Sequence, residues 1–247
     1  MGIIIQCIIS VLIFIVGVIL LPFLKKKVQD VRIVNYALSG AALFFYILLI
    51  ISDGVYHHWD AETIADVNPL SKLSPFVFAT AFFINFTPNA VKRYYFTIIS
   101  TLIIPMAYVG MFAALTDGLM NDMNYFVIWM YFDSFSHIAI ALLGIWLVIT
   151  DQISLERKNL FQSLGILYSF LLILIVVNLI FKTNFFGFSV YGGHHIYAVV
   201  IDPWILSFVT YFAGLTAFVV GDWFLCKAIA SRSKPTADPP EKQQPLT

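Results

Sequence analysis

The chain has 247 residues, of which 60% are hydrophobic, 17% aromatic and only 11% charged, and its formal net charge is zero. A soluble domain carries roughly 25% charged residues, so this chain lacks the polar side chains that a water-facing surface requires. The composition excludes a soluble enzyme or a nucleic-acid-binding module and predicts an all-α polytopic membrane protein that is surrounded by membrane lipids.

Seven stretches have about the 20 mostly apolar residues that a membrane-spanning helix requires. In chain order they cover residues 3–24, 33–51, 70–88, 94–115, 124–150, 160–181 and 199–226. The third is the weakest, because it begins with the polar run NPLSKLSP; its prolines suit a helix start, where missing backbone N–H groups cost little. Pro105 lies inside the fourth stretch and predicts a kink there. We expect residues 1–230 to form one seven-helix transmembrane bundle.

The basic residues indicate how these stretches cross the membrane, because Lys and Arg are enriched in cytoplasmic connections. Twelve of the 14 follow the first, third, fifth and seventh stretches, whereas the other connections hold only Lys72 and Lys182. This alternation predicts a multi-pass protein of the cell membrane with its N-terminus outside and its C-terminus in the cytoplasm. Residues 231–247, rich in proline and charge, are expected to be a disordered cytoplasmic tail.

Asp133 and His137 lie four residues apart inside the fifth stretch, so one helical turn places both side chains on the same face. Ionisable groups inside a span are costly unless they line a cavity, pair with each other or do chemistry. Histidine also transfers protons near neutral pH. We interpret the pair as a functional site in the outer half of the membrane or near its midplane. The alternative is that both groups only hydrogen-bond each other or neighbouring helices.

A nucleophile for this site is less clear from the sequence. Ser71 and Ser74 begin the third stretch on the outer side. With His137 as a general base and Asp133 orienting it, Ser74 or Ser71 is a candidate nucleophile. The alternative is that these serines only cap the start of a helix, which is their usual role at such positions.

Two asparagines are also predicted on the outer side. Asn178 lies near the outer end of the sixth stretch, and Asn184 follows it. We expect them to contact a lipid head group or to stabilise an oxyanion. The inner half holds little comparable, apart from Asn35 and Asp222 near the inner membrane boundary.

No metal or cofactor is expected. The histidine pairs at 57–58 and 194–195 are adjacent residues that point in different directions on a regular element, and no carboxylate stands at a zinc-protease spacing. Cys7 and Cys226 lie near opposite ends of the chain and form no metal-binding or redox motif. The seventh stretch has no lysine, which excludes a retinal Schiff base.

Three short motifs resemble the YwaF-type bacterial integral membrane proteins, whose eukaryotic relatives include a transmembrane phospholipid acyltransferase. The motifs are the start Pro69-Leu70, the intramembrane His137 and the run NLIFKTNFF at 178–186, and the resemblance covers about residues 65–225. It implies a functional role for His137. In the family the Pro-Leu start continues into a His-Leu-Cys-like stretch that supplies a catalytic cysteine. Here the run is PLSKLSP, so the cysteine nucleophile does not carry over.

The arrangement is also similar, more distantly, to the androgen-induced-gene-type lipid hydrolases, which hold a Thr and a His inside a small helical bundle. A Ser or Thr nucleophile is therefore compatible with the residues present. One hypothesis is a site that binds or processes acyl lipids. The alternative is a non-catalytic transporter or membrane-embedded binding protein, in which the same polar cavity holds a small ligand or relays a proton. The sequence leaves open whether the protein is an enzyme.

Overall fold

The computed structural model describes residues 2–56, 58–59, 73–99, 128–181, 195–196, 199–200 and 204–233. Within these ranges five helices are long and apolar enough to cross a membrane. This confirms the prediction of a helical protein with several membrane-length segments. In chain order the elements are α1 (Gly2–Lys27), α2 (Val31–Tyr56), α4 (Leu73–Phe83), the 3-10 helix η1 (Ile84–Phe86), α6 (Ile128–Ile149), α7 (Arg157–Phe181), β1 (His195–Ile196), β2 (Val199–Val200) and α8 (Trp204–Ser233).

The third predicted stretch, 70–88, is shorter as a helix than expected. It consists of α4 followed by the single turn η1. Thr87 has an extended backbone, with φ −88° and ψ 165°, because the ring of Pro88 disfavours a helical residue before it. The chain is helical again over residues 89–99, and the remainder of the fourth predicted stretch lies outside the described residues.

The last predicted stretch, 199–226, is displaced toward the C-terminus. Val199–Val200 pairs antiparallel with His195–Ile196, so the first two residues of this stretch belong to a β-strand rather than to a helix. The described part of α8 begins at Trp204 and continues to Ser233. The helix therefore extends into the first residues of the predicted tail, and residues 234–247 lie outside the described ranges.

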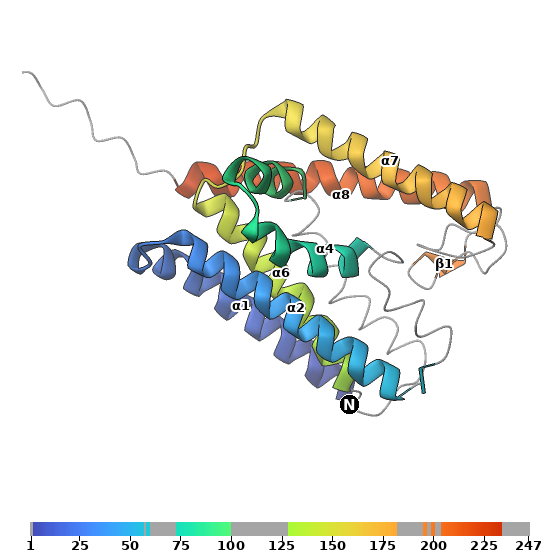
Figure 1. Ribbon diagram of the computed structural model, residues 1–247, viewed down its shortest axis with the longest axis horizontal. Helices are drawn as coiled ribbons and strands as arrows, with labels where there is room; N and C mark the ends of the chain where they lie inside the picture. Colours follow the sequence, from blue (N-terminus) through green and yellow to red (C-terminus); the bar gives the residue numbers. More distant parts are fainter. Residues whose placement is uncertain are drawn as a thin grey trace, which may run out of the picture.

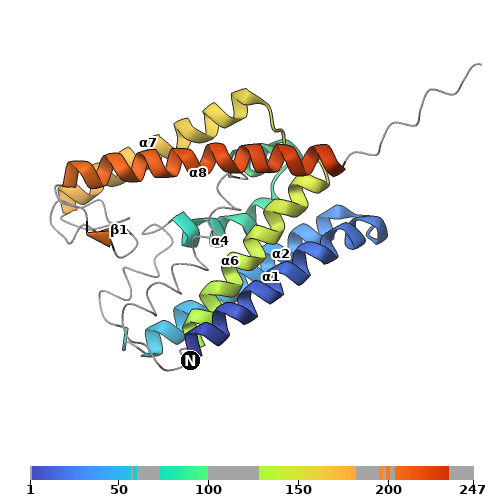
Figure 2. The ribbon, with the colours of Figure 1, turned by 180° about the vertical axis from the view of Figure 1, so that it is seen from behind.

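α6 is the central helix of the fold. It packs against α1, α2, α4 and α8, and it crosses the molecule between the α1–α2 pair and the α7–α8 pair (Figures 1 and 2). Every residue from 136 to 149 of this helix is buried. A helix at the centre of a bundle is expected to be apolar on all sides, because every face of it packs against other helices.

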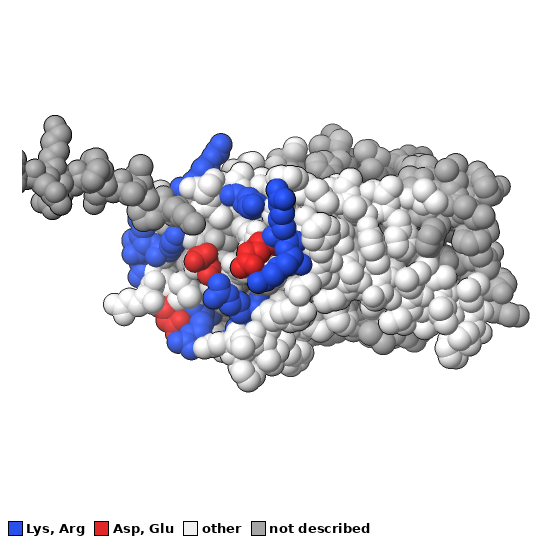
Figure 3. All heavy atoms as spheres, turned by 90° about the horizontal axis from the view of Figure 1, so that it is seen from above, with Lys and Arg blue, Asp and Glu red and all other residues white. Residues whose placement is uncertain are grey.

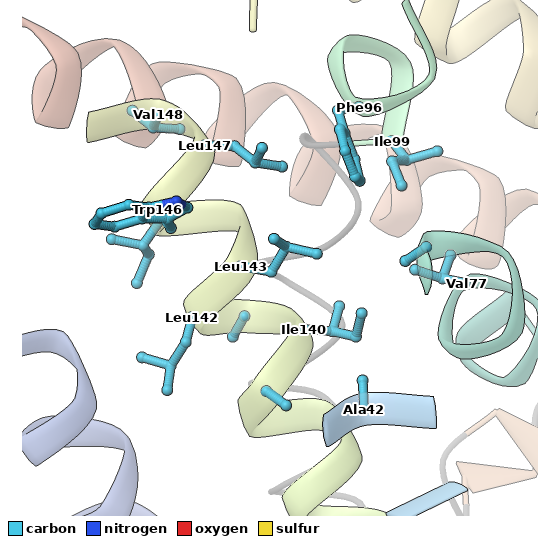
Figure 4. Close-up of a cluster of buried hydrophobic side chains, with 14 of the residues drawn as sticks. Ala42, Val77, Phe96, Ile99, Ile140, Leu142, Leu143, Trp146, Leu147 and Val148 are labelled. Carbon is cyan, nitrogen blue, oxygen red and sulfur yellow. The ribbon is translucent and has the colours of Figure 1, made fainter. Parts of the chain in front are cut away.

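Close packing around α6 comes from both its sides. Figure 4 shows Leu143 and Leu147 directed toward Phe96 and Ile99, whereas Leu142 points to the opposite side. On that side a Cβ atom on Gly17 of α1 would come within 2.6 Å of the Leu142 side chain. The absence of a side chain at position 17 therefore allows α1 to approach α6 closely, as small residues do in membrane bundles.

The outer helices have the opposite burial pattern to α6. α1 and α7 expose many large apolar side chains, with Phe161 of α7 at 69% exposure. Contiguous exposed apolar surface of this extent is not stable in water and is typical of a surface in contact with lipid.

The described basic residues gather at one end of the molecule, which we call the basic end. Here α1 ends, α2 begins, α6 is followed by α7, and α8 ends. Figure 3 shows the Lys and Arg side chains of one face crowded at this end, while the described remainder of that face carries none. Lys25 confirms the proximity of the connections, because its ammonium group donates to the carbonyl oxygen of Ile149. The grouping agrees with the alternation found in the sequence.

Candidate functional site

The predicted pair, Asp133 and His137, lies in the half of α6 that is distant from the basic end. His137 Nδ1 is 3.4 Å from Asp133 Oδ1 and 2.9 Å from the backbone carbonyl oxygen of Asp133. The two side chains share one face of the helix, as the spacing of four residues predicts. The Asp133 side chain is 28% exposed, whereas the His137 side chain is 7% exposed. The carboxylate is therefore the accessible member of the pair, and the imidazole is the enclosed one.

The contacts of His137 determine which ring nitrogen carries the proton. A carbonyl oxygen only accepts hydrogen bonds, so Nδ1 must be the donor at 2.9 Å. The nearby carboxylate oxygen favours the same proton position. The neutral imidazole then has its lone pair on Nε2, which is the atom that can accept a proton. Asp133 thus orients the ring in the way that the acid of a serine-hydrolase triad orients its histidine.

An aromatic ring from α4 packs against the imidazole of this pair and is itself backed by a ring from α2. The ring of Phe78 from α4 meets the imidazole edge-to-face, with ring centroids 4.8 Å apart. Tyr46 of α2 packs against Phe78 in turn, at 5.7 Å, and both aromatic residues are buried. These apolar rings lower the polarity beside the imidazole and so strengthen its electrostatic interaction with Asp133.

Ser74 lies on α4, one turn before Phe78, and is half-buried. The same face of α4 therefore carries both Ser74 and the ring that contacts His137. No hydrogen bond joins Ser74 to His137 in the part of the chain that the structure describes. Ser71 lies outside the described residues. The other hydroxyl that the sequence offers on this helix, Thr80, donates to the carbonyl of Phe76 and bonds to Tyr95.

Of the two predicted lipid-contacting asparagines, the structure describes only Asn178, and Asn178 does not join this pair. Asn178 is 1% exposed near the C-terminal end of α7, a helix that packs against α8. None of the described contacts connects Asn178 to Asp133 or to His137. Asn184 lies outside the described residues. The structure therefore brings together Asp133 and His137 and leaves the remaining predicted members of the site separate or undescribed.

A second group of polar side chains, which we call the amide cluster, lies at the basic end. Asn35 Nδ2 donates to Gln152 Oε1 at 2.7 Å, and Gln152 Nε2 donates back to Asn35 Oδ1 at 3.3 Å. Ser39, one turn after Asn35, accepts a hydrogen bond from Asn85 Nδ2 at 3.0 Å. The cluster joins α2, η1 and the connection between α6 and α7. Asn35, which stands out as a polar residue in the sequence, is thus one member of a larger hydrogen-bonded group.

The amide cluster also explains the role of Asn85 of η1. Asn85 is 3% exposed, and its amide donates to Ser39 Oγ and to the carbonyl oxygens of Ala81 and Phe82. An amide that is committed to three acceptors inside the protein is a packing group. A detectable signal existed in the sequence, because Asn35 and Ser39 stand at the i, i+4 spacing in an otherwise apolar run.

No group of three or more His, Cys, Asp or Glu side chains that could hold a metal ion occurs within the described residues. Both cysteines are free. Cys226 of α8 donates its thiol to Asp222 Oδ2 at 3.6 Å, and both side chains are buried.

The sequence and the fold were compared with known proteins. No protein-family model matches the chain, and neither a curated protein nor a solved structure matches it.

Proposed function

We propose that the chain is a seven-span protein of the cell membrane with its N-terminus outside, and that the Asp133/His137 pair is a site that processes acyl lipids. The alternation of basic connections supports this orientation, because it makes the basic end cytoplasmic. It puts the pair toward the outer half of the membrane. We also propose membership of the YwaF-type family, on the resemblance of the short motifs around Pro69, His137 and Asn178.

The observation that carries the proposal is the orientation of the imidazole. Nδ1 is occupied by the two acceptors of Asp133, so the lone pair of Nε2 faces away from its own helix turn. In the proposed reaction, Nε2 takes the proton of a hydroxyl group, whose oxygen attacks the ester carbonyl of a lipid. The ester bond breaks, and the departing lipid oxygen takes the proton from Nε2. Asp133 stabilises the imidazolium that exists between these two steps.

The attacking hydroxyl belongs to Ser74 in this proposal, or to water when Ser74 only positions the lipid. When Ser74 attacks, the acyl group is left as an ester on its Oγ; Nε2 then takes a proton from water, which attacks this ester, and Ser74 regains the proton as the free fatty acid is released. Ser74 is suited to either role because it stands on the face of α4 that contacts His137. Ser71, Asn178 and Asn184 are proposed to contact the lipid head group from the outer side.

A feature of α6 favours this reading over a transporter that relays protons. Between His137 and Asp151 the helix carries no ionisable side chain, and residues 138–149 are buried and almost entirely apolar. A proton relay through the membrane is built from a succession of ionisable groups. On this helix the pair is followed only by buried apolar residues as far as the basic end. This suits a site that is reached from the side of the membrane opposite the basic end.

The experiment uses the purified full chain, reconstituted with a mixture of phospholipids, and mass spectrometry to follow free fatty acid, lysolipid and transferred acyl products. We expect activity in the wild type and a loss of at least about a hundredfold in His137→Ala, which removes a general base. Asp133→Asn should retain the fold and lose part of the rate, because the amide no longer stabilises the imidazolium. Ser74→Ala distinguishes a serine nucleophile, whose loss abolishes turnover, from a water nucleophile.

Ser136→Ala is the matched control. Ser136 is the residue before His137 in α6, it is buried, and its hydroxyl donates only to the carbonyl oxygen of Phe132. The control should keep the activity. Equal product formation by the wild type and His137→Ala would refute the proposal. Uptake of a solute that responds to a pH gradient, without lipid turnover, would support the transporter instead.

A further inference from the structure

A groove of about 720 Å³ lies between the first turns of α7 and the last turns of α8. It is at the basic end and is separate from the Asp133/His137 pair. Its lining includes the basic residues Arg157 and Lys227, and its remaining surface is mainly apolar. The apolar side chains that the argument uses are Leu160, Phe161, Trp223 and Phe224.

The cationic part of the groove comes from two helices. Lys227 lies over the ring of Trp223, with Nζ 4.3 Å from the ring centroid. This cation–π contact holds the ammonium group against the groove wall without neutralising its charge. Within the described residues no carboxylate pairs with Lys227 or with Arg157, and no acidic residue is among those that line the groove.

Arg157 is the first residue of α7, where the backbone N–H groups are positively polarised and favour an anion. The neighbouring Glu156 does not cancel this charge, because its carboxylate is paired with Lys158 at 2.8 Å. The hydrogen bond from Lys158 holds the pKa of Glu156 below its usual range, so this pair remains ionised near neutral pH. The charge of Arg157 therefore remains available, together with that of Lys227, to an anion in the groove.

The apolar part of the groove continues into the lipid-facing surface. Phe161 is 69% and Phe224 is 61% exposed. Trp223, in contrast, is 5% exposed, and its indole Nε1 has no hydrogen-bond partner among the described residues. The Trp223 ring forms part of the groove wall, and the Lys227 ammonium group lies over it.

We propose that this groove binds one anionic phospholipid, with its phosphate between Arg157 and Lys227 and its acyl chains along Leu160, Phe161 and Phe224. Cationic pockets between transmembrane helices are a recurring form of site for anionic lipid head groups. The continuity of the apolar wall with the membrane-facing surface favours a lipid over a soluble phosphate compound, which would leave that wall in water. The orientation proposed above makes it a lipid of the cytoplasmic leaflet, but the preference for an anionic lipid does not depend on that orientation.

The test is native mass spectrometry of the full chain in detergent, with dioleoylphosphatidylglycerol and dioleoylphosphatidylcholine added in equal amounts. We expect one phosphatidylglycerol molecule to remain bound in preference to phosphatidylcholine. The double variant R157Q/K227Q should weaken this binding by on the order of tenfold. Circular dichroism verifies that the variant keeps its helices.

The control variant is K26Q/K27Q, which removes the same charge from exposed residues of the basic end that do not line the groove. It should leave the binding unchanged. Equal losses in both variants would mean diffuse surface attraction and would overturn the proposal, as would the absence of any preference between the two lipids. Displacement of the lipid by millimolar inorganic phosphate or glycerol 3-phosphate would also overturn it, because the groove would then be a site for a soluble anion. Since lipid binding is measured without turnover, its failure is distinguishable from failure of the proposed lipid-processing activity.

Discussion

The amide pair of Asn35 and Gln152 offers a quantitative test of how the basic end is held together. The two side chains exchange two hydrogen bonds across 117 residues of sequence, and Asn35 is fully buried. We consider the single variants Asn35→Ala and Gln152→Ala and the double variant. Each single substitution removes both hydrogen bonds. Gln152→Ala leaves the fully buried Asn35 amide without this partner, whereas Asn35→Ala leaves Gln152, which is only partly buried and keeps its hydrogen bond to Thr150 Oγ1.

The expected magnitudes follow from this geometry. Leaving a buried polar group unpaired costs about 1–3 kcal/mol, so Gln152→Ala should lose about 2 kcal/mol in the free energy of unfolding. Asn35→Ala should lose less, about 1 kcal/mol, because the remaining Gln152 amide is partly exposed and still bonded to Thr150. The double variant leaves no unpaired amide and should lose less than the sum of the two. Hydrogen bonds between membrane helices show coupling of about 0.6 kcal/mol each, so two bonds predict a coupling of about 1 kcal/mol.

The assay is reversible unfolding in mixed micelles of dodecyl maltoside and SDS, followed by circular dichroism. A parallel cycle pairs Asn35→Ala with Gln162→Ala, because Gln162 is exposed on α7 and shares no described partner with Asn35. That cycle should be additive. Additivity for distant sites holds within about 0.3–0.5 kcal/mol. A coupling inside this range for Asn35 and Gln152 would show that the amide pair does not contribute to stability as argued.

Three further predictions concern backbone positions and use the same unfolding assay. Gly17→Val should lower the free energy of unfolding by about 1–3 kcal/mol, because the new side chain would overlap Leu142, and an unchanged value would contradict the close approach of α1 to α6. Asp151 has φ 57°, so Asp151→Gly should be neutral or stabilising, whereas Asp151→Val should cost about 1–2 kcal/mol; equal effects would refute the left-handed conformation. Gly54→Ala should push the ring of Trp59 away, since a Cβ atom there would lie 2.6 Å from three ring atoms. The displaced indole is already 47% exposed, so we expect a red shift of its fluorescence with little loss of stability.

The sequence predicted those features that depend on short-range geometry. A continuous apolar run of membrane length indicates a helix regardless of its neighbours, which is why α1, α2 and α7 lie close to their expected bounds. The proximity of Asp133 and His137 follows from helix periodicity alone. The end of η1 was also accessible to this reasoning, because its C-terminal cap residue, Thr87, precedes a proline.

Features that depend on packing between helices could not be predicted. Asn35 and Gln152 are 117 residues apart, and nothing in the local pattern of either indicates that they meet. The same applies to Phe78, whose ring encloses His137, and to the groove between α7 and α8. A single sequence specifies which residues are apolar, but helix contacts are determined by which small or large side chains fit together.

The C-terminal end of α6 is held by contacts that also affect the Asp133/His137 pair in the other half of the helix. Asp151 N–H donates to the carbonyl of Val148, and Gln152 N–H donates to that of Leu147, which is the pattern of a Schellman cap with Asp151 in the left-handed conformation. Lys25 adds a cation at the Ile149 carbonyl, where the helix dipole is negative. The helix is thus fixed at the basic end.

A fixed helix end has a consequence for His137. The buried residues 138–149 transmit that position rigidly to the imidazole, because a close-packed helix does not shift without displacing its neighbours. Toward the start of the helix the burial is no longer continuous: Ser134 is buried, but Phe135 and Asp133 are partly exposed. The pair therefore stands where the rigid core ends and access begins. A functional imidazole needs both conditions, since its geometry must be held by the scaffold while Nε2 remains within reach of a ligand.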